Sequence, residues 1–202
     1  MAKELKLPLT CIGIPKTVDN DLPITDCSPG FGSVAKYVAT STLEAGLDVK
    51  SMSETSTKVF ILEVMGRHAG WIAAASALAS TNETDPPHII LMPEVPFAKK
   101  KFIDKVKQTV ADEGFCVVVA SEGTRYKNGM FLADSGLTDA FGHKQLGGVA
   151  PVLAQMISSI GLKNHWAVSD YLQRSARHIS SKTDLDQAYA VGKKAVEFAL
   201  AG

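Results

Sequence analysis

A short apolar run decides the fold: residues 58–64 read KVFILEV. Apart from its first residue and Glu63 it is apolar and rich in β-branched side chains, as expected of a strand that is covered on both faces. Similar runs occur at residues 9–14, 88–92, 115–120 and 165–168. Segments in which apolar residues recur with the period of a helix separate most of these runs. Strands that alternate with helices predict an α/β protein with a parallel sheet in a three-layer, Rossmann-like arrangement.

Five segments have the apolar spacing that is typical of helices. Gly46, Gly114 and Gly161 each follow the last apolar position of a segment, where a left-handed residue commonly ends a helix. Thr183 and Asp184 stand where the last helix needs its N-cap. We therefore expect helices over 33–45, 69–79, 99–113, 149–160 and 184–200.

The composition describes a globular protein without a strong overall field. Of the 202 residues 46% are hydrophobic, and 21 Lys and Arg balance 21 Asp and Glu. A neutral chain has no global field that gathers nucleic acid or an anionic membrane, so local groups must hold any anionic ligand. The three cysteines are odd in number and lack a C-x-x-C pair, which favours reduced thiols in a cytoplasmic protein. No apolar run approaches the ~20 residues that cross a bilayer.

Polar residues follow the first predicted strand at its carboxyl end, where open α/β sheets bind ligands. The chain reads PKTVDND at 15–21, which places Lys16, Thr17, Asp19 and Asp21 in one loop. One aspartate could accept a proton from an attacking hydroxyl while the other holds or orients a magnesium ion. A surface turn is an equally good interpretation of Asp-Asn-Asp.

The ends of other strands carry charged groups as well. Residues 65–71 read MGRHAGW, in which Arg67 can bind phosphate through two parallel hydrogen bonds. Ser-Glu-Gly supplies Glu122, and Tyr-Leu-Gln-Arg supplies Arg174. A carboxylate beside two guanidinium groups can bind a phosphorylated polyol. The carboxylate accepts hydrogen bonds from hydroxyls, and each guanidinium group can donate two parallel hydrogen bonds to phosphate. The glycines of PGFGS at 29–33 would let helix-start amides approach an anion.

Four of these motifs resemble the phosphofructokinase family, in their order and at their intervals, over nearly the whole chain: PKTVDND, MGRHAGW, Ser-Glu-Gly and Tyr-Leu-Gln-Arg. The resemblance implies the parallel-sheet substrate domain of a phosphofructokinase, which acts on fructose 6-phosphate. It divides the chain into the end of a donor-side domain with the catalytic-base loop (1–50), a sugar phosphate-binding domain (51–175) and a return helix (176–202). It also implies Mg²⁺ in the complete enzyme, with no metal ligand assigned in this chain, and a homo-oligomer.

The resemblance also implies roles for single residues. Asp19 matches the catalytic base that deprotonates the sugar 1-hydroxyl, and Asp21 matches its partner in organising the site. Arg67 would steady the transferring phosphoryl group, Glu122 would bind sugar hydroxyls, and Arg174 would bind the 6-phosphate. The substrate-binding positions are Lys16, Thr17, Lys58, Met65, Gly66, Glu122, Tyr171 and Arg174.

Two positions depart from the family pattern, and a third differs between the branches of the family. Lys58 stands where many members have an arginine that crosses a subunit interface, and a lysine supplies the charge without the planar fork. Tyr171 follows an aspartate where the family often has glycine. Lys16 resembles the pyrophosphate-dependent branch, because ATP-dependent bacterial enzymes usually have glycine there; both donors stay open.

The Gly-Gly-Asp-rich loop that cradles the donor phosphates in the family is not found in this sequence. We therefore expect a fragment, truncated at both ends, that binds fructose 6-phosphate weakly, self-associates and does not turn over alone. A non-catalytic module that binds a sugar phosphate is the alternative, although a pure binder has little use for a base at Asp19. Residues 124–148 lack a clear period, and their His143 is expected to organise a loop rather than to act as a base.

Overall fold

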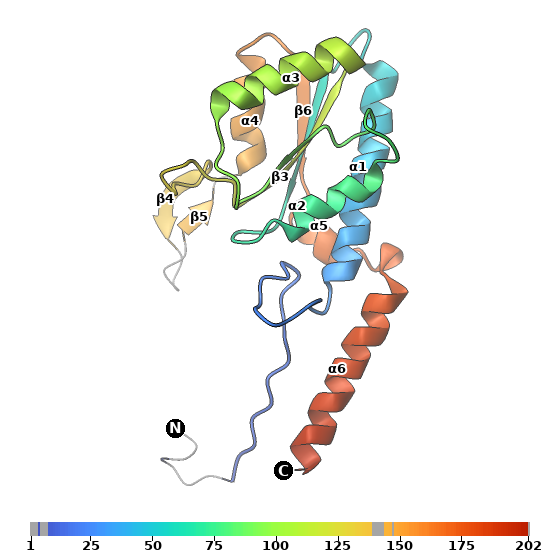
Figure 1. Cartoon of the computed structure of the whole chain (residues 1–202), viewed down its shortest axis with the longest axis vertical. Coiled ribbons are helices and arrows are strands. Elements are labelled where there is room, and N and C mark those ends of the chain that lie inside the picture. Colours follow the sequence, from blue (N-terminus) through green and yellow to red (C-terminus); the bar gives the residue numbers. More distant parts are fainter. Residues whose placement is uncertain (1–3, 5–7, 139–143, 147, 202) are drawn as a thin grey trace.

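A four-stranded parallel sheet forms the centre of the computed structural model, which describes residues 4, 8–138, 144–146 and 148–201. Its strands follow the order β2-β3-β1-β6 (Figure 1). Their bounds are Val59–Val64 for β1, Ile89–Leu91 for β2, Cys116–Ser121 for β3 and Asn164–Val168 for β6. A separate antiparallel pair, β4 (Asp134–Thr138) and β5 (Lys144–Leu146), lies within residues 124–148, the segment without a clear period. The predicted α/β class is confirmed.

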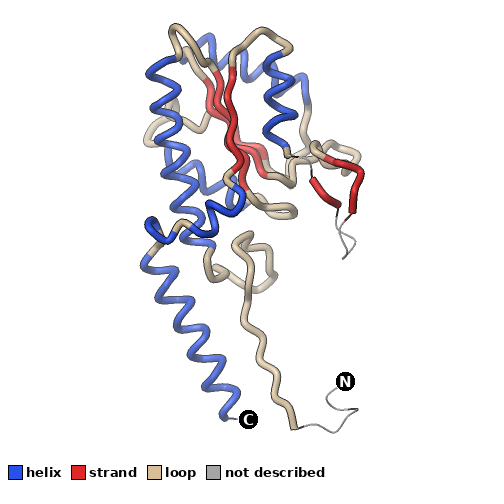
Figure 2. Tube along the Cα trace, turned by 180° about the vertical axis from the view of Figure 1, so that it is seen from behind, coloured by secondary structure: helices blue, strands red, loops and turns tan. Residues whose placement is uncertain are grey.

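Helices cover both faces of the sheet, so the domain has three layers (Figure 2). On one face lie α3 (Lys99–Glu113) and α4 (Val149–Ser158), and on the other lie α1 (Phe31–Met52) and α2 (Trp71–Ala75). Val59 and Ile61 of β1 pack in the first interface, while Leu62 and Val64 pack in the second. Because successive side chains of a strand point to opposite faces, this one apolar run supplies both cores.

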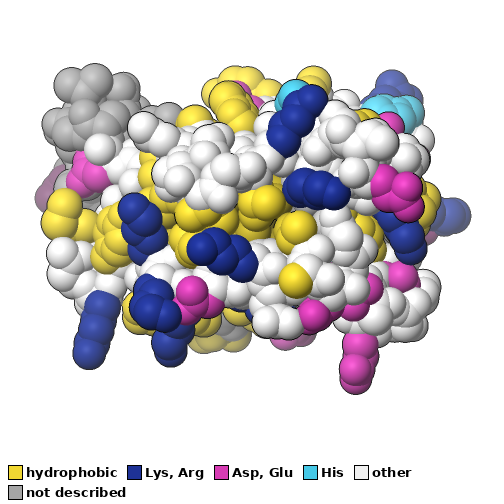
Figure 3. Space-filling model, turned by 90° about the horizontal axis from the view of Figure 1, so that it is seen from above, with side chains coloured by type: hydrophobic (Ala, Val, Ile, Leu, Met, Phe, Trp, Pro, Cys, Tyr) yellow, Lys and Arg dark blue, Asp and Glu magenta, His cyan; other side chains and the backbone are white. Residues whose placement is uncertain are grey.

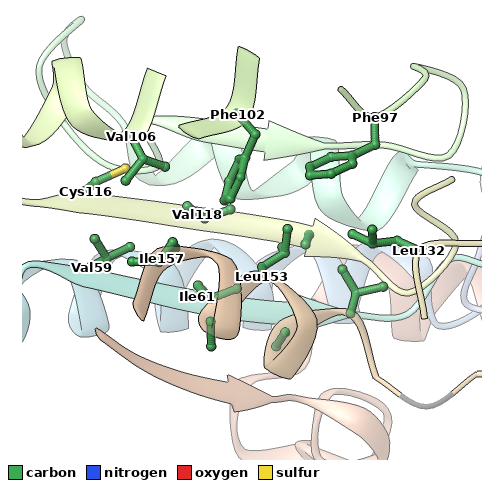
Figure 4. Close-up of a cluster of buried hydrophobic side chains, with 14 of the residues drawn as sticks. Val59, Ile61, Phe97, Phe102, Val106, Cys116, Val118, Leu132, Leu153 and Ile157 are labelled. Atoms are coloured by element: carbon green, nitrogen blue, oxygen red, sulfur yellow. The ribbon is translucent and has the colours of Figure 1, made fainter. Parts of the chain in front are cut away.

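The larger core lies between the sheet, α3 and α4 (Figure 4). Phe102 and Val106 of α3, and Leu153 and Ile157 of α4, are four residues apart in their helices and therefore share a face. They pack with the β3 side chain Val118. Full burial of each such side chain contributes roughly 1.5–3 kcal/mol, so this interface stabilises the fold.

Only one of the three glycines predicted to end a helix does so, and α4 ends at Ser158 with Ser159, not Gly161, as its C-cap. α3 ends at Gly114 with a left-handed φ of 82°, as predicted. Gly46, however, lies buried inside α1, which continues to Met52. A Cβ at this position would lie 2.6 Å from Cγ of Pro86. The glycine is needed for close packing against the proline, not for ending the helix.

The last helix, α6 (Lys182–Ala201), begins two residues before its predicted start. Ser181 precedes it, and the Ser181 hydroxyl accepts the Asp184 amide at 3.4 Å. The predicted cap is therefore wrong, because Ser181 is the capping residue and Asp184 lies in the first turn.

The segment after β6 also contains two elements that were not predicted, α5 (Asp170–Ser175) and the 3₁₀ turn η2 (Arg177–Ile179). A second 3₁₀ turn, η1 (Ser76–Ala79), completes the helix expected over 69–79.

Residues 9–14, predicted as the first strand, form no strand. In the described part of the chain no strand pairs with them, and a strand needs a neighbour to satisfy its backbone. Leu9, Ile12 and Ile14 are exposed. The segment runs beyond the sheet beside α6 (Figure 1), and Ile12 and Ile14 line a cavity of about 310 Å³ together with Phe198.

Replacing Gly46 with alanine should destabilise the fold by about 1–3 kcal/mol, because the new methyl group would have to displace Pro86. Gly192→Ala in α6 is the matched control. No atom outside the helix lies within 4 Å of its Cβ position, so the better helix former should be neutral or stabilise by up to ~1 kcal/mol. Urea unfolding at a constant m value checks both changes, and a Gly46→Ala protein as stable as the control would contradict the packing argument.

Candidate functional site

A cavity of about 490 Å³ opens at the carboxyl ends of β1 and β3. The loop before α1, the sheet and α5 form its polar walls, and Ala188 and Gly192 of α6 form another wall. Six residues that the sequence proposed for the site line this cavity: Lys16, Thr17, Asp19, Met65, Glu122 and Arg174. Segments more than 150 residues apart in the sequence therefore meet at one place.

The acidic groups of the cavity bind protons more tightly than free carboxylates do. Burial raises the pKa of Asp19 above its ordinary value, the Asp21 carboxylate raises it further, and Arg67, His68 and Lys16 oppose the rise. Burial likewise raises the pKa of Glu122, against the positive charge of Arg67. Raised pKa values of this kind are typical of carboxyl groups that exchange protons in active sites.

The loop that carries Asp19 is held by its own side chains. The Thr17 hydroxyl accepts the Asp19 amide at 3.2 Å. Asn20 is buried with a left-handed φ of 55°; its Oδ1 accepts the Ser28 amide at 2.8 Å, and its Nδ2 donates to the Asp26 carbonyl at 3.1 Å. Sequence reasoning missed Asn20, although asparagine is one of the residues that tolerate this conformation.

The loops that follow β1 and β3 fit tightly against each other. A Cβ on Gly123 would lie 2.1 Å from the carbonyl oxygen of Arg67. The Ser121 hydroxyl donates to the carbonyl oxygen of Gly66, which has a φ of 124°, and Arg125 Nη2 donates to the Arg67 carbonyl at 3.3 Å. These contacts fix the backbone that carries the Arg67 guanidinium.

The unpredicted helix α5 carries Arg174, which lines the cavity, and its neighbours Gln173 and Tyr171. Gln173 is 2% exposed; its Oε1 accepts the Met65 amide at 3.3 Å, and its Nε2 donates to the Asp170 carbonyl at 3.0 Å. The Arg174 guanidinium lies 5.1 Å from the ring centre of Tyr171. The tyrosine is 67% exposed and lines none of the cavity, whereas Arg174 does.

Glu63 is a second residue that sequence reasoning missed. This buried carboxylate of β1 accepts the Ala150 amide at 2.7 Å, at the start of α4, where the capping residue Gly148 has no side chain to offer. Burial raises the pKa of Glu63, and the amides at the start of α4 oppose the rise. Its carbonyl accepts the Ser169 amide at 2.9 Å, so it joins β1 to the start of α5 as well. A lone acidic residue in a buried strand is the signal that could have revealed it.

The structure does not bring Lys58 into the cavity. This residue precedes β1 and lies at the opposite end of the strand, where its Nζ donates to the Ser53 carbonyl. Figure 3 looks onto that end of the molecule, where basic side chains are interspersed with acidic and apolar ones. His143 lies outside the described residues.

Among the residues that the structure describes, no three His, Cys, Asp or Glu side chains form a group that could hold a metal ion. No helix among these residues is long and apolar enough to span a bilayer.

The chain is similar to known proteins over its whole length. The family model Phosphofructokinase matches residues 1–199. A pyrophosphate--fructose 6-phosphate 1-phosphotransferase of Halomonas elongata is 66% identical over 203 residues, which cover all of this chain and 48% of that protein. The enzyme of the same description from Methylococcus capsulatus is 59% identical, again over 48% of its length. The chain thus spans about half the length of the curated relatives it matches.

A solved structure agrees with these relatives. The crystal structure of a pyrophosphate-dependent phosphofructokinase from Marinobacter aquaeolei superposes with a TM-score of 0.86 at 63% identity, over all of this chain and 47% of that one. The likeness therefore extends from the four motifs to the fold that positions them. The chain belongs to the phosphofructokinase family.

Proposed function

We propose that this chain forms the sugar phosphate side of a phosphotransferase that moves a phosphoryl group from pyrophosphate to the 1-hydroxyl of fructose 6-phosphate. One observation carries the proposal: Asp19, Glu122 and Arg174, from three distant segments, line one cavity. Arg67 lies close enough to lower the pKa of both carboxyl groups against the effect of burial. A base, an acceptor for hydroxyls and two guanidinium groups are the parts that this reaction needs.

The substrate would be held at both ends. Arg174, whose guanidinium is exposed on α5, binds the 6-phosphate through two hydrogen bonds, and the neighbouring Tyr171 ring limits where that guanidinium can go. Glu122 accepts hydrogen bonds from sugar hydroxyls. Because Gln173 ties α5 to the amide of Met65, the distance between the phosphate end and the reacting end is set by the fold.

Asp19 would then act as the general base. Its carboxylate takes the proton of the 1-hydroxyl, the sugar oxygen forms a bond to the donor phosphorus, and the bond from that phosphorus to the leaving phosphate breaks. Arg67 spreads the negative charge of the transferring group. Burial raises the pKa of Asp19, which makes its carboxylate a stronger base than an exposed aspartate.

The donor and the metal belong to the complete enzyme. Lys16 lines the cavity and places a positive charge where a compact pyrophosphate fits better than a nucleotide; ATP is the alternative donor. Mg²⁺ supplies positive charge to the donor phosphates in such reactions. We assign it no ligands here, because the described residues contain no three-residue group suited to a metal.

The remaining expectations concern the protein as a whole. We propose a cytoplasmic homo-oligomer, in which Lys58, far from the cavity of its own chain, serves the site of a neighbouring subunit. The division of the chain at residues 50 and 175 stays a prediction; α1 extends past the first boundary and packs on the sheet.

The 202-residue chain alone is expected to bind fructose 6-phosphate weakly and to turn over neither pyrophosphate nor ATP. Sugar-contacting groups are present, but in-line transfer also needs the donor cradle. The exposed apolar side chains of 9–14 and α6 should make the chain self-associate. Calorimetry with fructose 6-phosphate, a fructose 1,6-bisphosphate assay and light scattering measure the three properties, and clear turnover would show that the donor site lies within this chain.

In a chimera where this chain replaces the matching part of the Halomonas elongata relative, Asp19→Asn should lower kcat about a thousandfold with little change in KM, since a base acts in the transition state. Arg174→Ala should instead raise KM for fructose 6-phosphate at least about tenfold. Steady-state kinetics separate the two. An Asp19→Asn chimera that keeps its kcat would remove Asp19 from the mechanism.

The pH profile of kcat/KM tests the charges around the base. Asp19 must be unprotonated to react, so activity should fall as the pH drops through a pKa above the ordinary 3.8. Asp21→Asn removes a charge that raises this pKa and should move the acid limb to lower pH. Lys16→Met removes a charge that lowers the pKa and should move the limb to higher pH. If both variants moved the acid limb in the same direction, Asp19 would not be the group whose titration sets that limb.

A further inference from the structure

The only buried residue of α6 is an aspartate, Asp184, which is 5% exposed. Its Oδ1 accepts the amide of Gly30 at 2.8 Å, and its Oδ2 accepts the amide of Ser33 at 3.2 Å and the Ser33 hydroxyl at 2.5 Å. These are first-turn amides of α1, which have no partner within their own helix. The anion that the glycines of 29–33 were expected to hold is thus a carboxylate of the same chain, 151–154 residues away.

The two helix starts cap each other. Ser33 of α1 donates its hydroxyl to Asp184 and accepts the amide of Ser181, the residue that precedes α6, at 3.1 Å. Gly32 leaves room for this contact, because a Cβ there would lie 3.3 Å from Cβ of Asp184. The start of α6 is therefore fixed to the start of α1 by a buried polar cluster, and a negative charge at the amino end of α1 is favoured by the helix dipole.

The residues that start α1 also hold both neighbours of Asp19. Gly30, with a φ of 98°, lies so close to Val18 that a Cβ would be 2.9 Å from the valine Cγ1. Ser28 accepts the Phe31 amide through its carbonyl at 3.1 Å and donates its own amide to Asn20. Val18 and Asn20 flank Asp19 in the sequence, so the position of its carboxylate depends on where α1 begins.

We propose that Asp184 is a positioning residue for the catalytic base: by capping α1 it sets the place of Gly30 and Ser28, and through them the loop that carries Asp19. The same hydrogen bonds place α6, whose Ala188 and Gly192 line the cavity. A simple cap would affect stability alone. The proposal rests on the proposed function in one respect, namely that Asp19 is the base.

Asp184→Asn in the chimera tests the kinetic consequence. The amide keeps the shape of the side chain but loses the charge and turns an NH₂ group toward the α1 donors. We expect kcat to fall at least about tenfold, with KM for fructose 6-phosphate changed less than about threefold, because a displaced base costs transition-state rather than ground-state interactions. Ser33→Ala, which removes one of the same hydrogen bonds, should change kcat in the same direction.

Asp186→Asn is the matched control. Asp186 lies in the same turn of α6, but it is 65% exposed and pairs at the surface with Lys182 at 2.5 Å. An exposed pair of this kind contributes little, so kcat, KM and Tm should stay unchanged.

Hydrogen exchange measured on the 202-residue chain gives a readout independent of turnover. The Asp19 amide, bound to the Thr17 hydroxyl, and the Asn20 amide should exchange at least about tenfold faster in Asp184→Asn, while the β3 amides keep their rates. A lower Tm with unchanged exchange at residues 19–20 would overturn the proposal and leave a structural cap. If the unsubstituted chimera lacks phosphotransferase activity, the proposed function fails, and the exchange rates still decide whether Asp184 holds the loop.

Discussion

The parallel pairing of β1 with β3 is the interaction on which the site depends. Its register sets Val59 opposite Cys116 and Val64 opposite Ser121, and it continues one step further where the Glu122 amide donates to the Val64 carbonyl at 2.9 Å. The two loops that leave these strands are therefore adjacent from their first residue. A slip of one residue would turn every side chain of the strand to the other face, burying the polar groups of one loop and separating it from the other.

Internal anions already occupy two helix starts near the sheet's carboxyl edge. Glu63 binds the start of α4, and Asp184 binds the start of α1. Helix amino ends are ready-made phosphate sites in many proteins, but here they are filled by the chain itself. Under the proposed function an incoming phosphate would rely on side chains, and the guanidinium group of Arg174 belongs to a residue that lines the cavity. This agrees with a neutral chain that has no long-range field to offer.

The sequence alone predicted what short-range signals encode. The run KVFILEV, the glycine at the end of α3 and the order of the motifs each depend on neighbours within a few residues, and the strands β1, β2, β3 and β6 lie where they were expected. Gly46 was misread because its reason is a proline 40 residues later. Glu63 was missed as a cap of α4 and Asp184 as a cap of α1, because their partners lie 87 and more than 150 residues away. Residues 9–14 form no strand because a strand's partner is not a local property.

The loop at 15–21 separates two tasks. Thr17 and Asn20 make the hydrogen bonds that shape it, while Lys16 is exposed and projects at the cavity wall. A replacement at position 16 leaves those hydrogen bonds intact, whereas one at 17 or 20 does not. Under the proposed function Lys16 faces the phosphoryl donor, so evolution could alter donor preference at this position without disturbing the loop that carries the base.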